Sequence, residues 1–192
     1  MPIEYVKKQL AQKVKSINLA NSGIVDDDIR GIVQTINNTP GLHLYELNLD
    51  CNNISDEGFT ELLTLKGVDR INLDRNNVSQ TGLKKLFSSK ECAIKYINLS
   101  RNALGLAIST PALSSVTQGE DLVKLISDYD GSVKLQITSG NGLTLTAIKE
   151  IENIQEKKHI MASIAQQATD SKESTDHFVA SVEHLKKSMP KI

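Results

Sequence analysis

One short pattern of aliphatic residues and asparagine recurs four times in the first half of this 192-residue chain. Each copy has aliphatic side chains at its positions 1, 4, 6 and 11, and an Asn-Leu pair at positions 5 and 6. The copies begin at Val14, Leu44, Val68 and Ile94, so they are 30, 24 and 26 residues apart. Self-similarity at a period of roughly 20 to 50 residues indicates stacked structural units that share one continuous core.

The spacing within each copy predicts a short β-strand followed by a turn. Because strand side chains alternate, positions 4 and 6 point to the same side and form one wall of the core. Position 9 is Asn52, Asn76 or Asn102 in three copies and Ser22 in the first. A buried amide there can bond backbone groups that lose their ladder partners where the strand ends. We therefore predict that Asn52, Asn76 and Asn102 form a structural asparagine ladder.

Each predicted strand is followed by a segment with helical spacing. Ser55 and Ser79 occupy equivalent positions in the second and third copies and are typical helix N-cap residues. Gly58 and Gly82 are also equivalent, and we expect them to allow a helix to approach a strand closely. One strand and one helix per unit indicate an α/β repeat architecture.

The pattern L-x-x-L-x-L-x-x-N-x-L resembles the leucine-rich repeat. The string Asn52-Asn-Ile-Ser-Asp-Glu-Gly58 resembles one that recurs in the ribonuclease-inhibitor-like class of these repeats. The resemblance covers about residues 14–110 and implies a right-handed βα solenoid of about four repeats, with a parallel sheet on its concave face and helices on its convex face. The irregular repeats, the excess of Lys over Arg and the helical tail are also similar to leucine-rich-repeat effectors that bacterial pathogens deliver into host cells.

The sequence divides into four expected segments. Residues 1–13 form an N-terminal capping helix, 14–110 the repeats, 111–146 a C-terminal cap and 147–192 a mainly helical tail.

In the cap, alternating aliphatics precede an Asn-Gly pair, a combination typical of a β-hairpin. The alternative is a degenerate fifth repeat, which would lack the ladder asparagine because Gly140 falls at position 9. We favour the hairpin. In the tail we favour two antiparallel helices over one long helix that forms a homodimer.

Composition excludes several classes of protein. The 22 basic and 23 acidic side chains leave a net charge of −1, which argues against a general nucleic-acid binder. Two cysteines are too few for a disulfide scaffold and favour a reducing compartment. The chain starts without the apolar core of a signal peptide and contains no run long enough to span a membrane. We therefore expect a cytoplasmic protein or, if it is an effector, one delivered to the host cytosol.

Strand positions that take no part in the core supply the candidate binding residues. The chain has 18 Lys and only four Arg, yet Arg70, Arg75 and Arg101 all fall on the predicted concave face. Arginine and tyrosine are enriched at the energetic centres of protein interfaces. The neighbouring charges of Arg75 and Arg101 require an acidic neighbour, either internal or on a partner protein. The predicted partner-binding residues are Tyr45, Glu46, Arg70, Asp74, Arg75, Tyr96 and Arg101.

Position 5 is asparagine in all four copies: Asn18, Asn48, Asn72 and Asn98. An amide ladder between neighbouring strands is the favoured interpretation, because opposed side chains on adjacent strands interact. A ligand-binding stripe is the alternative.

We predict a non-enzymatic module that binds a partner protein, with no cofactor and no metal. No phosphate-cradling glycine loop is present, and neither cysteine has a histidine near it in the pattern. One alternative is an assembly protein that self-associates through its C-terminal helices. Another is a GTPase-activating protein with Arg75 or Arg101 as an arginine finger.

Overall fold

The computed structural model describes residues 2–89, 92–104, 115–129, 133–137, 140–143 and 145–170. The chain divides into two compact units, Met1–Glu152 and Asn153–Ile192. The strands in the described residues all belong to the first unit: β1 (Ser16–Asn18), β2 (Leu44–Asn48), β3 (Val68–Asn72), β4 (Tyr96–Asn98) and β5 (Lys134–Gln136). The helices are α1 (Pro2–Ala11), α2 (Asp26–Asn37), α3 (Asp56–Leu62), α4 (Gln80–Ser88), α5 (Ser115–Asp128) and α6 (Leu145–Asp170), the last of which continues into the second unit.

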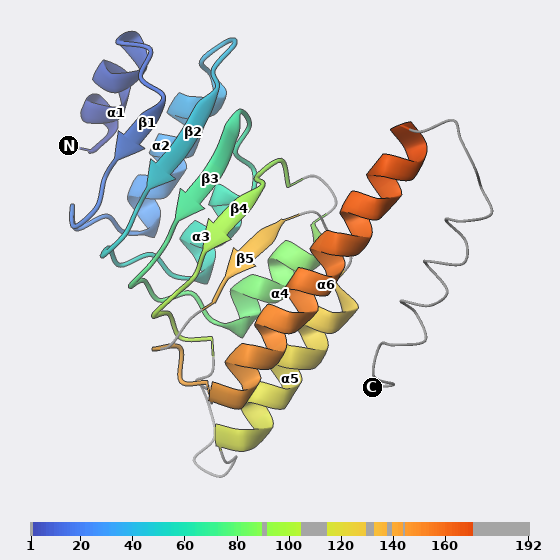
Figure 1. Cartoon of the computed structure of the whole chain (residues 1–192). Coiled ribbons are helices and arrows are strands. Elements are labelled where there is room, and N and C mark those ends of the chain that lie inside the picture. The colour runs from blue at the N-terminus through green and yellow to red at the C-terminus, as the bar shows by residue number, and fades with distance from the viewer. Residues whose placement is uncertain are drawn as a thin grey trace. The chain divides into compact units, whose positions relative to one another are not determined.

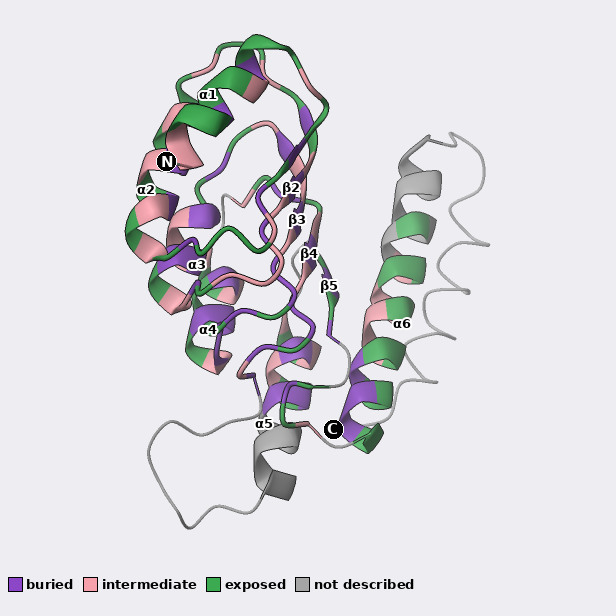
Figure 2. Cartoon of the chain, turned by 90° about the vertical axis from the view of Figure 1, so that its left-hand side faces the viewer, coloured by how far each residue is buried: buried purple, intermediate pink, exposed green. Residues whose placement is uncertain are grey.

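The strands form one parallel sheet in the order β1-β2-β3-β4-β5 (Figure 1). A helix follows each of the first four strands in the chain, so every neighbouring pair is joined by a βαβ connection. Helices α2, α3 and α4 lie side by side along one face of the sheet (Figure 2). This arrangement confirms the expected α/β leucine-rich-repeat solenoid. We call the opposite face, formed by strand positions 2, 3 and 5 and the following turns, the concave face.

The core consists of aliphatic rows that run across the sheet. Position 4 of successive repeats pairs Leu47 with Ile71, Ile71 with Ile97, and Ile97 with Leu135. All four side chains are at most 5% exposed. Phe59 of α3 is the one fully buried aromatic among the largest buried side chains in the described residues. The predicted spine of matched aliphatics is therefore present, and it lies between the sheet and the helices (Figure 2).

Asparagine amides, buried at Asn76 and Asn102 and half-buried at Asn52, join consecutive repeats where the strands end. Asn102 Oδ1 accepts a hydrogen bond from the Val78 amide at 2.9 Å, and Asn102 Nδ2 donates to the carbonyls of Leu73 and Ser100 at 2.8 and 2.9 Å. Asn76 makes the equivalent bonds to Ile54, Leu49 and Asp74. Asn52 bonds Ser22, Ile24, Leu19, Leu49 and Asp50 in the same manner. Each amide therefore ties its own turn to the preceding repeat.

A fourth amide extends this row beyond the repeats that the sequence pattern identifies. Asn141 is fully buried, accepts a hydrogen bond from the Asn102 amide at 2.8 Å and donates to the Leu99 carbonyl at 3.0 Å. It stands one residue later than position 9 would require, because Gly140 occupies that position. Because of this offset of one residue, the repeat pattern does not identify Asn141 as a ladder residue.

The preference for a β-hairpin in residues 132–146 is wrong. Strand β5 pairs in parallel with β4, with Lys134 opposite Tyr96 and Gln136 opposite Asn98. Leu145, which a hairpin would place in its second strand, begins helix α6. The segment is a degenerate fifth repeat, since Leu135 and Ile137 are buried in the same way as positions 4 and 6 of the other repeats.

The two ends of the first unit carry helices. Val6 and Leu10 of α1 are buried, whereas the neighbouring Tyr5 is 42% exposed. At the other end, Ala147 and Ile151 of α6 are buried. The second helix predicted for the tail, with Phe178 and Leu185, lies outside the described residues. Among the helices that the structure describes, none has the length and apolarity needed to cross a bilayer.

Replacing one ladder amide tests how strongly the row holds the repeats together. Asn102→Ala leaves the Val78 amide and the Leu73 carbonyl buried without partners, and each such group costs roughly 1–3 kcal/mol. We expect the free energy of unfolding, measured in urea, to fall by about 3 kcal/mol. Asn77→Ala, in an exposed neighbouring position, is the matched control and should lower it by no more than about 0.5 kcal/mol. Equal effects of the two changes would contradict a structural ladder.

Candidate partner-binding face

Three predicted binding residues meet at the centre of the concave face. Tyr45 on β2, Arg70 on β3 and Tyr96 on β4 come from adjacent strands. The Arg70 guanidinium carbon lies 4.1 Å from the ring centroid of Tyr96 and 5.5 Å from that of Tyr45. Arg70 Nη1 also donates a hydrogen bond to the Tyr45 hydroxyl at 3.1 Å. The two rings therefore hold the guanidinium by cation–π contacts and a hydrogen bond.

The Tyr96 phenol is shielded by its position in this cluster. Burial raises the pKa of Tyr96 above its usual range, and the charge of Glu46 acts in the same direction. The nearby Arg70 guanidinium opposes this shift, by its charge and by a hydrogen bond. Tyr96 also donates a hydrogen bond to Oε1 of Gln136 on β5. The ring is thus fixed between Arg70 and the last strand of the sheet.

Charges at strand position 2 neutralise one another. Lys95 Nζ lies 2.8 Å from Asp69 Oδ1, and His43 Nε2 lies 3.3 Å from Asp69 Oδ2. The hydrogen bond from Lys95 lowers the pKa of Asp69, and the charges of Lys95 and His43 add to the effect. Asp69 therefore stays ionised and paired, and this part of the face offers little free charge.

Arg101 takes part in a structural ion pair. Its Nε donates to Asp74 Oδ1 at 2.8 Å, and its Nη2 donates to Asp74 Oδ2, so the pair is bidentate. Asp74 is only 7% exposed, and the hydrogen bond to it raises the pKa of the Arg101 guanidinium. The expected clash between Arg75 and Arg101 is thus relieved internally by this carboxylate. Both carboxylate oxygens of Asp74 and the Nε–Nη2 edge of Arg101 are therefore already engaged.

Arg75 is held more loosely than Arg101. Its Nη1 lies 2.9 Å from Cys51 Sγ and 3.8 Å from Asp50 Oδ2. The other carboxylate oxygen, Asp50 Oδ1, is the one buried side-chain oxygen in the described residues that lacks a hydrogen-bond partner. The Arg75–Asp50 pair therefore occupies the same positions in its repeats as Arg101–Asp74. It lacks the bidentate hydrogen bonds of that pair.

Position 8 of the first four repeats has a left-handed backbone. Asn21, Cys51, Arg75 and Arg101 have φ angles between 51° and 54°. This conformation is uncommon for residues other than glycine, asparagine and aspartate. The chain adopts it where it turns out of the strand, and this directs the Arg75 and Arg101 side chains along the rim. The aliphatic pattern carried no signal for this feature.

The position 5 asparagines mainly bond their own strand ends. Oδ1 of Asn18, Asn48, Asn72 and Asn98 each accepts a hydrogen bond from the amide two residues later, at 3.0–3.1 Å. One bond joins neighbouring strands, from Asn98 Nδ2 to Asn72 Oδ1 at 2.9 Å. The favoured ladder between strands is thus partial, and the Asx-type turn is the main role of these side chains.

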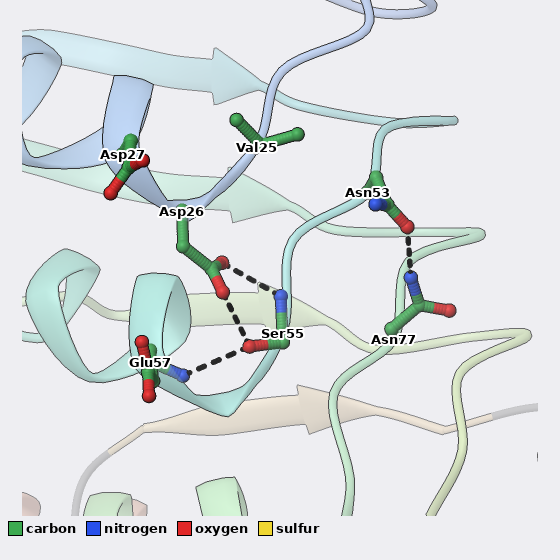
Figure 3. A pocket seen from close by; sticks show the side chains of 7 residues that line it. All are labelled: Val25, Asp26, Asp27, Asn53, Ser55, Glu57 and Asn77. Atoms are coloured by element: carbon green, nitrogen blue, oxygen red, sulfur yellow. Dashed lines mark hydrogen bonds between the residues drawn. The ribbon is translucent and has the colours of Figure 1, made fainter.

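A shallow depression of about 350 Å³ lies at the N-terminal ends of α2 and α3, away from the predicted residues (Figure 3). Its lining includes Asp26, Asp27 and Glu57. Asp26 accepts hydrogen bonds from the amide and the hydroxyl of Ser55, at 2.8 and 2.5 Å. A Cβ atom on Gly58 would stand 2.3 Å from Asp26 Oδ1. Gly58 therefore makes room for the carboxylate of the preceding repeat, rather than for a strand as the sequence suggested.

The described residues also bear on metal binding and on cysteine reactivity. No three His, Cys, Asp or Glu side chains among them gather closely enough to hold a metal ion. Burial raises the pKa of the Cys92 thiol, which disfavours the reactive thiolate. His177 and His184, two histidines of the predicted tail, lie outside the described residues, so the structure does not test them as metal ligands.

Comparison with known proteins supports the repeat assignment. A family model described as a leucine-rich repeat matches residues 42–63, and no curated protein matches the chain. Similar solved structures include actin-binding site 2 of leiomodin-1, with 14% identity, a TM-score of 0.57, and coverage of 88% of this chain and 96% of that one. The tropomodulin C-terminal domain of Caenorhabditis elegans has 16% identity, a TM-score of 0.56, and coverage of 88% and 99%. At these identities the likeness shows the leucine-rich-repeat fold alone.

Gly58→Ala tests the close approach of consecutive helices. Within an ordinary helix this change stabilises by roughly 0.5–1 kcal/mol. Here the added methyl group meets Asp26 Oδ1 and, at 2.9 Å, Ile54 Cγ2. We expect the free energy of unfolding in urea to fall by about 1–3 kcal/mol. Glu57→Ala, at an exposed neighbouring position, is the control, and a gain in stability for Gly58→Ala would contradict the packing described.

Tyr96 should titrate at higher pH than an ordinary tyrosine, whose pKa is about 10. The Arg70 guanidinium lowers the pKa of Tyr96, so Arg70→Gln should move the transition further upward. Tyrosinate absorbance during alkaline titration measures both, and Tyr96→Phe identifies the Tyr96 contribution. Because the folded pKa is raised, the stability contributed by the neutral phenol is full below about pH 10 and is lost as the pH rises through the folded value. A Tyr96 transition at or below that of the other tyrosines would contradict the assignment.

Proposed function

We propose that the chain is a protein-binding module whose concave face recognises a partner protein. The central cluster of Tyr45, Arg70 and Tyr96 is the observation that carries this proposal. Tyr45 is 51% exposed, so a large aromatic surface faces solvent next to an oriented guanidinium. Exposed aromatic side chains and arginine are the residue types that dominate the energetics of protein interfaces. Their fixed geometry lowers the entropic cost of binding.

The predicted binding residues divide into two groups under this proposal. Tyr45, Glu46, Arg70 and Tyr96 offer surface or charge to a partner, and Arg75 lies at the edge of this area. Asp74 and Arg101 stabilise the rim of the face through their mutual bonds. Contact with a partner therefore centres on β2, β3 and β4.

The leiomodin-1 neighbour is an actin-binding site by its name, which makes actin one candidate partner to test. Membership of the ribonuclease-inhibitor-like class and a role as a delivered bacterial effector remain expectations from the repeat sequence. Neither the effector role nor a cytoplasmic location draws support from the two neighbours, and the proposal does not depend on them.

The alternative functions have less support. An arginine finger must be free to reach a nucleotide, whereas the Nε and Nη2 groups of Arg101 both donate to Asp74. Self-association through the tail stays a prediction, since residues 171–192 of the tail lie outside the described range. Sedimentation of the full chain against a version that ends at Gly142 would test it.

A site-specific crosslinking experiment tests the concave-face proposal. A photoreactive phenylalanine analogue replaces Tyr45 in the full chain, and proteins that crosslink in a cell extract, or to purified actin, are recovered. We expect a defined crosslinked partner, and we expect Arg70→Ala to reduce its recovery tenfold or more, the effect of removing an interface hot spot.

Lys84→Ala is the matched control, because Lys84 is an exposed cation on α4, on the opposite face of the sheet. It should leave recovery unchanged. Arg101→Ala is avoided, since it would strand the buried Asp74 carboxylate and could unfold the turn. If the analogue crosslinks equally well at Lys84, or if Arg70→Ala has no effect, the concave face is not the binding surface.

A further inference from the structure

Most charges on the concave face cancel within the chain, and those that do not are arranged in one row. The ion pairs are Lys95–Asp69, Arg101–Asp74 and Arg75–Asp50. The charged side chains on this face without an ion pair among the described residues are Lys15, Glu46, Arg70 and Lys134. The last three stand at the same strand position in β2, β3 and β5.

The sheet register fixes the order of this row. Glu46 is paired with Arg70, Arg70 with Tyr96, and Tyr96 with Lys134. Across the strands the row therefore presents a carboxylate, a guanidinium, a phenol ring and an ammonium group. Neighbouring strands are about 4.8 Å apart, so the backbone positions of Arg70 and Lys134 lie about 10 Å apart, one strand to either side of Tyr96.

Arg70 is prepared to receive a carboxylate. Tyr45 and Tyr96 hold its guanidinium: Nη1 donates a hydrogen bond to the Tyr45 hydroxyl, and a hydrogen bond also joins the guanidinium to the Tyr96 phenol. The remaining N–H groups are spare donors, and a guanidinium fork matches a carboxylate in a bidentate manner. Glu46 repels acids on one side of Arg70, so a second acid on the same partner segment is directed toward Lys134.

We infer that the partner segment is an amphipathic α-helix that lies across the strands with two acidic residues seven positions apart. Residues i and i+7 of a helix lie on the same face, about 10.5 Å apart, which matches the separation of Arg70 and Lys134. Residues i+3 and i+4 lie halfway between them and face the part of the Tyr96 side chain that the Arg70 guanidinium leaves uncovered, where an apolar side chain fits. A basic residue at i−4 or i−3 faces Glu46. An extended segment fits this row less well, because successive side chains on one of its faces are about 6.6 Å apart.

This inference rests on the proposed function and names the partner's chemistry at the same face. The probe is a display library of helical 18-residue peptides with randomised charged and apolar positions, selected against the full chain. We expect Asp or Glu at i and i+7, with an apolar residue between them, to be enriched severalfold over their frequency in the library. In individual selected peptides, replacing either acid by its amide should weaken binding about tenfold in fluorescence anisotropy, the usual loss for a hydrogen bond to a charged group.

Charge reversal separates recognition from loss of fold. Selection against a chain with Arg70→Glu and Lys134→Glu should enrich Lys or Arg at i and i+7, a result that an unfolded protein cannot give. The milder Arg70→Gln chain should lose the preference for an acid at i alone. Lys84→Glu, the control on α4, should select the same peptides as the unaltered chain.

Two results would overturn the inference. They are the absence of enriched helices, and enrichment that does not follow the charges of Arg70 and Lys134. If the Tyr45 crosslink still captures an Arg70-dependent partner in that case, the concave face binds a partner of different chemistry and the proposed function stands. If that crosslink fails as well, the proposed function falls with the inference.

Discussion

Hydrogen bonds between asparagine side chains and the backbone at the strand ends set the spacing on which the rest of the structure depends. The strands are only three to five residues long, so few ladder bonds hold each repeat to the next. Asn52, Asn76, Asn102 and Asn141 each bond the backbone of the preceding repeat where the strands end. These bonds replace ladder partners that the backbone would otherwise lack in the core. They fix the register in which Glu46, Arg70, Tyr96 and Lys134 face solvent together.

The same register produces two kinds of polar cluster on the concave face. In the turns after β3 and β4, Asp74 and Arg101 satisfy each other and stabilise the chain reversal. On the strands, Arg70 is held by rings and a hydroxyl, groups that orient its charge without neutralising it. A charge that is oriented but unpaired is available to a partner at low entropic cost. This difference, rather than the number of arginines on the face, identifies Arg70 as its centre.

Sequence reasoning succeeded where the repeat spacing is strict. Matched positions such as Leu47, Ile71 and Ile97 stack in register, because each must bury its side chain against the same core. Sequence reasoning failed at the C-terminal end of the repeats. One additional residue there moves Asn141 out of position 9, and the alternation in 133–137 also fits a hairpin. A parallel strand and a hairpin strand bury the same alternate residues, so local pattern cannot choose between them. The presence of a preceding repeat to pair with decides the matter.

The amino-acid sequence by itself determined the repeat, the aliphatic spine and the face on which the tyrosines and arginines stand. These follow from periodicity, since side chains at equal offsets in stacked units must share one side of the sheet. Only the tertiary structure decided which charges remain free. Arg75 and Arg101 occupy equivalent positions in the sequence, yet only Arg101 makes a bidentate pair with a carboxylate. Pairing depends on atomic distances between different repeats, and those distances are set by packing rather than by the local pattern of residues.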